Sequence, residues 1–336
     1  MQIIVWNALR IMVLQFTRSM LFVISLLIIA SGEASSAQFA VRFSQSLNGS
    51  WEFVKVSELR YPPPQVAWRE IDIPRCIFGI NYERAWFRRT FKVPAHWRGK
   101  RIKIRFGGVK FNSIVYVNGR KVGGHFGGYE PFEVDVTTNI RFNEQNELLV
   151  GVHDWTGVFV GERVDFTKLR PGVEARSLPT DRVIAPIGGH YNWYGIWDDV
   201  TLIALPNIYI ADVFVKPSVR KRMLVVDVTV RNESNAPAKV NLTASVLDGD
   251  SKVLTFDATP IAVKPNGEAT ITLRKRWAKP RLWSPHDPYL YWLDLKLEDV
   301  AQQLLDYHRV RFGFREIWTR GPHFYLNGVR IHLLAT

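Results

Sequence analysis

The strongest constraint on the fold is a two-residue alternation of polar and apolar side chains that recurs along the chain after residue 38. Arg101–Phe106 (RIKIRF) alternates basic residues with Ile, Ile and Phe, and Ser113–Val117 (SIVYV) runs directly into Asn118-Gly119 and a second alternating run. This period is typical of strands with one buried face, and Asn-Gly favours a tight hairpin because both turn positions need positive φ. Helical periodicity is almost absent from the same region. The sequence therefore predicts an all-β protein.

The alternating runs fall into two groups with a boundary near Pro206. Residues 38–205 have longer loops, which favours a jelly-roll β-sandwich. Residues 206–312 have about seven short, regularly spaced strands, which is typical of an immunoglobulin-like β-sandwich. Residues 313–336 add one more hairpin, around Asn327-Gly328. The strands expected in the second group are Ile208–Val215, Met223–Arg231, Lys239–Leu247, Ala269–Trp277 and Tyr289–Leu297, with a turn at Asp248-Gly249.

The N-terminal segment has the pattern of a signal peptide. An apolar run, Met20–Ala30, follows Arg10 and Arg18 and precedes a small-x-small pattern that ends at Ala37. As a helix this run would rise about 16 Å, which is too short for a bilayer core of about 30 Å. We therefore expect residues 1–37 to be a cleaved signal peptide, the protein to be secreted or periplasmic, and no stable membrane anchor to persist after cleavage. An uncleaved anchor is the alternative.

The composition excludes several classes of function. Cys76 is the single cysteine, which excludes an intrachain disulfide and a multi-cysteine zinc site. The eight histidines are dispersed, without an H-x-H or H-E-x-x-H motif, so we expect no metal and no cofactor. The formal net charge is +13, but the densest basic clusters, Arg220–Arg222 and Arg274–Arg276, lie beside expected strands. They are interpreted as solvated strand ends, and no nucleic-acid partner is expected.

Six segments combine aromatic, glycine and charged residues in a fixed order along the chain. They are Ser46–Phe53 (SLNGSWEF), Ala85–Phe91 (AWFRRTF), the stretch from Phe106 to Val136, Tyr194–Val200 (YGIWDDV), Leu282–Tyr291 (LWSPHDPYLY) and the tail from Phe312 to Leu334. Together they resemble the N-terminal half of glycoside hydrolase family 2, the family of β-galactosidases, β-glucuronidases and β-mannosidases. The resemblance implies a galactose-binding-like, sugar-binding-type jelly roll, an immunoglobulin-like sandwich and a short stub of the catalytic (β/α)8 barrel.

The chemistry implied by that resemblance needs more chain than residues 313–336 provide. Retaining glycosidases use two carboxyl groups about 5–5.5 Å apart. In this family both are glutamates of the barrel, which takes about 250 residues. We therefore expect no catalytic residue here and a truncated chain that is inactive alone. Three Asn-Glu pairs resemble the family's acid/base dipeptide but are interpreted as turns: Asn143-Glu144, Asn146-Glu147 and Asn232-Glu233.

Two loops offer aromatic faces and polar groups suited to a sugar ring. The candidate substrate-binding residues in them are Asp154, Trp155, Tyr191, Asn192 and Trp193. Packing between domains is the alternative for Trp155 and Trp193, because large aromatic residues usually fill interfaces. Relatives that hydrolyse galactosides would carry an aspartate at the position of Gly189, and its absence argues against a direct galactose contact.

Three functions remain open at this point. The chain could be the non-catalytic part of a secreted family 2 glycosidase whose barrel segment is missing or on another chain. It could be a stand-alone carbohydrate-binding module, with carbohydrate as its partner. It could also be a scaffold that docks a separate barrel chain, which the unfinished hairpin from Phe324 to Leu334 favours because an unpaired strand edge seeks a partner.

Overall fold

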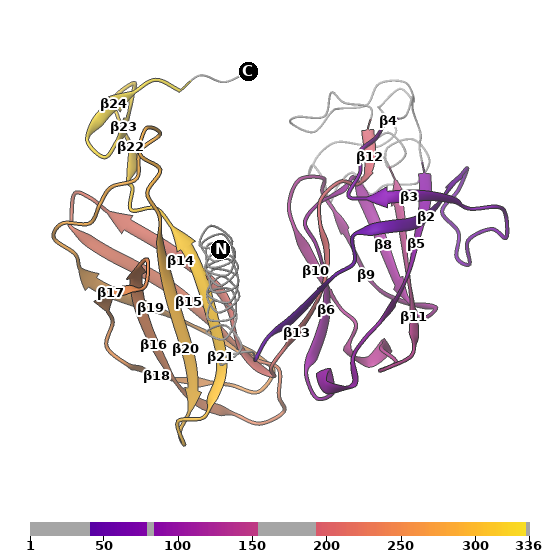
Figure 1. The fold of residues 1–336 in the computed structure, drawn as a ribbon, viewed down its shortest axis with the longest axis horizontal. Helices are drawn as coiled ribbons and strands as arrows, with labels where there is room; N and C mark the ends of the chain where they lie inside the picture. The colour runs from indigo at the N-terminus through magenta and orange to yellow at the C-terminus, as the bar shows by residue number, and fades with distance from the viewer. Residues whose placement is uncertain (1–40, 79–83, 154–192, 334–336) are drawn as a thin grey trace, which may run out of the picture. The chain divides into compact units, whose positions relative to one another are not determined.

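The computed structural model describes residues 41–78, 84–153 and 193–333, and these form antiparallel β-sheets almost throughout, which confirms the all-β prediction (Figure 1). The chain divides into two compact units between Asn207 and Ile208. The expected signal peptide lies outside the described residues. Within the described ranges, no helix is long and apolar enough to cross a membrane.

The first unit, residues 42–207, contains thirteen strands and two short 3-10 helices within its described part. They are β1 (Phe43–Ser46), β2 (Gly49–Val56), β3 (Arg69–Ile73), β4 (Ile77–Phe78), β5 (Arg84–Lys92), η1 (Ala95–Trp97), β6 (Arg101–Phe106), β7 (Val109–Lys110), β8 (Asn112–Val117), β9 (Arg120–Phe126), β10 (Phe132–Asp135), η2 (Thr137–Asn139), β11 (Gln145–His153), β12 (Trp193–Ile196) and β13 (Val200–Leu205).

Two sheets of this unit form a β-sandwich. One has the strand order β1-β13-β6-β10 and the other β3-β2-β5-β11-β8-β9, and a small sheet, β4-β12-β7, closes one end. Non-consecutive neighbours in both large sheets match the jelly-roll expectation. Alternation explains the core: Ile102, Ile104 and Phe106 of β6 are fully buried while the residues between them are not. The core between the sheets also takes Val115 and Val150 from the facing sheet.

The six-stranded sheet buries part of its outer face as well. Trp86 of β5 and Leu149 of β11 form a second apolar cluster there, against Leu59 and Trp68 from the segment that joins β2 to β3. A neighbouring contact of the same segment is Tyr61, whose ring stacks on that of Tyr116 of β8, with ring centroids 4.4 Å apart. This segment therefore covers part of the outer face.

The second unit contains the remaining strands. They are β14 (Ile208–Ser218), β15 (Met223–Asn232), β16 (Ala238–Asp248), β17 (Ser251–Thr255), β18 (Thr259–Val263), β19 (Gly267–Arg276), β20 (Tyr291–Asp299), β21 (Leu304–Phe312), β22 (Ile317–Arg320), β23 (His323–Leu326) and β24 (Val329–Ile331).

These strands form a second sandwich, as the immunoglobulin-like expectation required. Its sheets have the orders β14-β15-β19 and β17-β16-β20-β21, and β18 also pairs with β16. Every second residue of β15 from Leu224 to Val230 is fully buried. The same holds for Leu293, Leu295 and Leu297 of β20. Burying such side chains contributes about 1.5–3 kcal/mol each.

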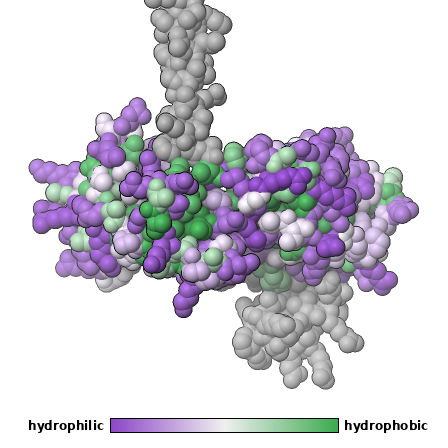
Figure 2. Space-filling model, turned by 90° about the horizontal axis from the view of Figure 1, so that it is seen from below, coloured by the Kyte–Doolittle hydropathy of each residue, from purple (hydrophilic) through white to green (hydrophobic). Residues whose placement is uncertain are grey.

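Hydrophilic residues cover most of the face seen in Figure 2, with hydrophobic residues in smaller patches.

A small sheet, β22-β23-β24, follows the second sandwich. The chain leads into it through Phe314, which is fully buried in the second core, and Glu316, which accepts hydrogen bonds from Arg220. Register places Ile317, Phe324 and Val329 on one face of this sheet, and these side chains are 58%, 40% and 68% exposed. That it is the start of a catalytic barrel stays a prediction.

Candidate functional site

Of the five predicted substrate-binding residues, Trp193 alone lies within the described ranges; Asp154, Trp155, Tyr191 and Asn192 fall outside them. Trp193 begins β12, where it pairs with Phe78 of β4. Two residues further on, Gly195 pairs with Lys110 of β7 on the other side of β12. The small end sheet thus brings β7 and β12 together, although the two are far apart in sequence.

A buried lysine lies against the Trp193 ring. Lys110 is only 1% exposed, and its Nζ lies 4.1 Å from the centroid of Trp193 and 5.5 Å from that of Tyr129. An ammonium over an aromatic face is attracted to the ring quadrupole, more strongly where water is excluded. Lys110, Tyr129 and Trp193, together with Trp197, are called the aromatic–lysine cluster below.

Close glycine contacts hold Trp197 in this cluster. Its ring centroid lies 5.9 Å from that of Trp193 in an edge-to-face arrangement, and its Nε1 donates a hydrogen bond to the carbonyl oxygen of Gly128. A Cβ on Gly108 would come within 2.3 Å of the Trp197 ring. Since no side chain fits at Gly108, the glycine is what lets the indole lie flat against the β7 backbone.

The turn that carries Tyr129 is fixed by Glu130. Glu130 accepts a hydrogen bond from the backbone N–H of Tyr129, and its other carboxylate oxygen lies 3.1 Å from His125 Nε2. Burial raises the pKa of Glu130, but the backbone N–H groups and His125 outweigh it and hold the pKa below its usual value. The carboxylate therefore stays ionised as an anchor of the turn.

The aromatic–lysine cluster has the chemistry of a sugar-contact surface. Tyr129 is 49% exposed and offers a ring face, and the partly exposed Trp193 lies beside it. Sequence reasoning missed Lys110, Tyr129 and Trp197 as site residues. The motif around Tyr129 (GGYEPF) was visible, but no local pattern distinguishes a buried lysine, since lysine is almost never fully buried unless paired.

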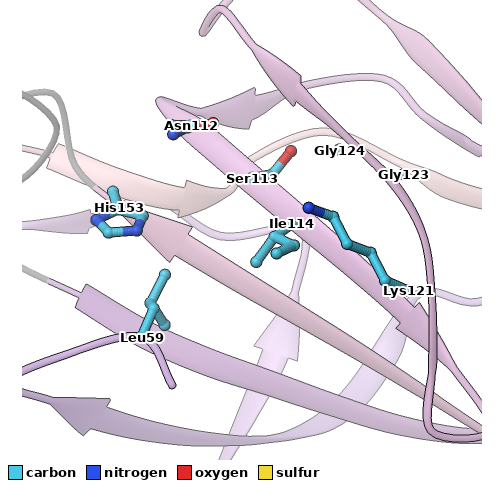
Figure 3. A pocket seen from close by; sticks show the side chains of 8 residues that line it. All are labelled: Leu59, Asn112, Ser113, Ile114, Lys121, Gly123, Gly124 and His153. Carbon is cyan, nitrogen blue, oxygen red and sulfur yellow. The ribbon is translucent and has the colours of Figure 1, made fainter. Parts of the chain in front are cut away.

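A second candidate site is a pocket of about 250 Å³ on the outer face of the six-stranded sheet (Figure 3). Figure 3 shows the Lys121 side chain reaching along β8 toward Ser113, with the His153 ring and Leu59 on the other side. The eight lining residues are Leu59, Asn112, Ser113, Ile114, Lys121, Gly123, Gly124 and His153. None of these eight carries a carboxylate.

The Asn-Glu pairs that resemble a catalytic dipeptide serve the backbone instead. The buried Asn146 side chain accepts a hydrogen bond from the N–H of Arg141 and donates to the carbonyl oxygens of Arg141 and Glu144. Glu233 accepts a hydrogen bond from the Tyr209 hydroxyl. Asn146 and Glu147 lie in strand β11 and not in the predicted turn, because Asn146 pairs with Phe91 and Glu147 with Thr90 of β5.

No more than one carboxylate lines any of three pockets found among the described residues. The pocket of Figure 3 has none, the pocket beside β3 and β4 has Glu70, and the one on the outer face of β16 and β20 has Asp294. Groups of three or more His, Cys, Asp or Glu side chains that could hold a metal are also absent from the described part of the chain.

Known proteins match both units. Residues 70–206 match the sugar binding domain of glycosyl hydrolases family 2, and residues 208–315 match the domain described as glycosyl hydrolases family 2. A β-glucuronidase of Bacteroides fragilis is 29% identical over 87% of this chain and 39% of its own length. A β-galactosidase of Thermoanaerobacter pseudethanolicus is 28% identical over 74% of this chain and 31% of its own length.

Solved structures give the same result. A Bacteroides uniformis β-glucuronidase 2, covalently bound to cyclophellitol-6-carboxylate aziridine, superposes with a TM-score of 0.68 and 25% identity over 86% of this chain and 34% of that one. The chain thus spans between about a third and two fifths of the length of these relatives. Because the two domain matches run nearly without a break through most of the sequence, the chain belongs to glycoside hydrolase family 2.

Proposed function

We propose that these 336 residues are the non-catalytic, carbohydrate-facing part of a secreted family 2 glycoside hydrolase and do not hydrolyse glycosides alone. The observation that carries this proposal is that the two family matches, at residues 70–206 and 208–315, both fall on β-sandwich units. The sparse carboxylates of the described pockets support it, because retaining hydrolysis needs two such groups about 5–5.5 Å apart.

Hydrolysis of nitrophenyl glycosides tests the absence of activity. The purified full chain should release no nitrophenol from β-glucuronide, β-galactoside or β-mannoside substrates above the rate of a buffer blank. The Bacteroides fragilis β-glucuronidase serves as the positive control on the glucuronide. Turnover by the chain at ordinary enzymatic rates would overturn the proposal.

Secretion is part of the proposal and rests on the N-terminal sequence pattern alone. N-terminal sequencing of the protein recovered outside the bacterial cytoplasm should begin at Gln38. Recovery of the uncut chain in a membrane pellet would instead support the uncleaved anchor.

The scaffold function is a second candidate, favoured by the exposed apolar face of the β22–β24 sheet. We propose that this face, with Ile317 and Val329 as its most exposed large apolar side chains, docks a catalytic barrel segment. If it has no occupant, the purified chain should self-associate through it. Light scattering should then give a mass above that of one chain, and an Ile317→Ser/Val329→Ser variant should return it to the monomer. A monodisperse wild-type monomer would count against this candidate.

A further inference from the structure

The pocket of Figure 3 results from the strand register on the outer face of the first sandwich. One cross-strand row consists of Arg84, His153 and Asn112 on β5, β11 and β8. The next outward-facing row along the strands contains two glycines, Gly151 of β11 and Gly124 of β9, on either side of Ile114. Because glycine has no side chain, this row leaves a hollow in the sheet surface at Gly151 of β11 and Gly124 of β9.

Both glycines are required by close contacts. A Cβ on Gly124 would lie 2.2 Å from the carbonyl oxygen of Ser113, and a Cβ on Gly151 would lie 2.8 Å from Ile114 Cγ2. Larger residues at these positions would force the strands apart. The hollow is therefore built into the backbone packing of β8, β9 and β11 and does not depend on the rotamer of a surface side chain.

Donors and cations line the hollow. Arg84 Nε donates a hydrogen bond to His153 Nδ1 at 3.3 Å, and this contact holds the buried His153 ring at the edge of the hollow. The Lys121 ammonium, and the Asn112 carboxamide side chain, make no hydrogen bond or ion pair within the described part of the chain. Because no lining residue is acidic, the field in the hollow favours an anion.

Two apolar side chains complete the lining. Leu59 and Ile114 face the same hollow as the polar groups. An apolar surface next to amide and ammonium donors suits a sugar ring, whose C–H groups are apolar and whose edge is hydroxylated. The volume of about 250 Å³ is that of a single ring and its substituents rather than of an oligosaccharide.

We propose that this pocket binds one carboxylated sugar residue, a hexuronate, with its carboxylate at Lys121 and its hydroxyl groups toward Asn112. It is a binding site on the outer face of the sandwich, and nothing in the proposal requires hydrolysis. Binding at this pocket can therefore be tested independently of glycosidase activity.

Calorimetric titration of the full chain with D-glucuronate, D-glucose and acetate tests the ligand class. Glucuronate should bind with a Kd of about 1 mM, and glucose and acetate at least about tenfold more weakly, because each lacks one half of the recognised chemistry. No heat with glucuronate at concentrations of about 20 mM, or equal affinity for glucose, would overturn the proposal.

Variants locate the site. Lys121→Met keeps the length of the side chain and removes its charge, and should weaken glucuronate binding at least about tenfold. The matched control is Lys92→Met, at an exposed lysine of β5, which should bind like the wild type. Unchanged affinity in Lys121→Met, or loss of binding in Trp193→Ala with Lys121→Met unaffected, would overturn the assignment to this pocket.

A measurement on the wild type covers the case in which a variant misfolds. Glucuronate should shift the backbone amide resonances of Asn112, Ile114 and Lys121 in a heteronuclear NMR titration, and leave those of β20 in place. Shifts confined to other strands would exclude the pocket even if glucuronate binds.

Discussion

The two sandwiches reach the same architecture with different interiors. The second is filled mainly by alternating aliphatic residues, such as Val226 and Val228 of β15 and Leu295 of β20, with a few aromatic side chains such as Tyr291 and Phe314. Among the largest fully buried side chains of the first are Trp51, Trp86 and Lys110. In the first sandwich several glycines make room for large rings, whereas in the second this occurs where Gly313 lies against Trp283 and most of the core follows a regular two-residue pattern.

This difference suits the second sandwich to structural support and the first to ligand recognition. An interior of interchangeable aliphatic residues tolerates volume-conserving exchange and makes a stable platform. Aromatic rings that pack against glycine backbone hold their faces, and the hollows beside them, at fixed positions. Both candidate sites lie on the first sandwich, which has such rings.

The largest expected effect is in the second core. Leu295→Ala removes a fully buried side chain of β20, and should lower the free energy of unfolding by about 3 kcal/mol, from lost burial and the remaining cavity. Urea unfolding measures the loss, and hydrogen exchange locates it. Faster exchange should be confined to β16, β20 and β21. If hydrogen exchange became equally faster in β5 and β11, the two units would unfold together, and the contrast between the two sandwiches would be wrong.

The next effect tests the glycine contacts of the first sandwich. Gly108→Ala places a Cβ where the Trp197 ring lies and should cost about 2 kcal/mol of unfolding free energy. The control is Gly267→Ala in the second unit, where the nearest atom, the carbonyl oxygen of Lys264, is 3.3 Å away and a cost within about 0.5 kcal/mol is expected. Similar costs at both positions would remove the distinction between the interiors.

A polar network in the first sandwich should give a smaller effect. Asn146→Ala leaves the N–H of Arg141 and two carbonyl oxygens without their partner and should cost about 1.5 kcal/mol. Thermal unfolding followed by circular dichroism measures it, with Asn139→Ala as control, because the Asn139 side chain accepts a solvent-exposed hydrogen bond from the hydroxyl of its neighbour Thr138. A cost no larger than that of the control would show that water replaces the network.

The smallest effect is pH-dependent and belongs to the second unit. Burial raises the pKa of Glu316, but hydrogen bonds from Arg220 lower it further, so that the pKa lies below the usual 4.5. The contribution to stability is therefore complete above pH 4.5 and is lost as the pH falls through the lower, folded-state pKa. Glu316→Gln should be less stable than the wild type by under about 1 kcal/mol at pH 7. The gap should close in acid, and a gap that widened in acid would contradict this sign.

Local patterns predicted the strands well where alternation is strict. Arg101–Phe106 is β6 without a shift, and Asn118 and Gly119 both have positive φ, at 50° and 81°, as the hairpin required. At the Asp248-Gly249 turn, the flanking residues Asp248 and Ser251 pair, so Gly249 and Asp250 form its centre, one residue later than expected. Of those two, Gly249 alone has positive φ. Two adjacent turn-forming residues left the position of the turn ambiguous.

The candidate sites were less accessible from sequence. Trp193 was predicted, but Lys110 meets it because β7 pairs with β12, and Tyr129 reaches it from the turn between β9 and β10. The pocket of Figure 3 depends on which residues of four strands share a row, and a shift of one residue would turn Asn112 and Lys121 to other positions. Such information lies in the long-range register, which no local pattern contains.

The perpendicular indole pair of the first sandwich also has an optical consequence. Trp193 and Trp197 lie edge-to-face with ring centroids 5.9 Å apart, in a rigid chiral frame. Their electronic transitions should couple and produce an exciton band in the ultraviolet circular dichroism spectrum. The two indoles are thus an intrinsic chromophore pair, and their exciton band can report ligand binding or unfolding at the aromatic–lysine cluster without an attached dye.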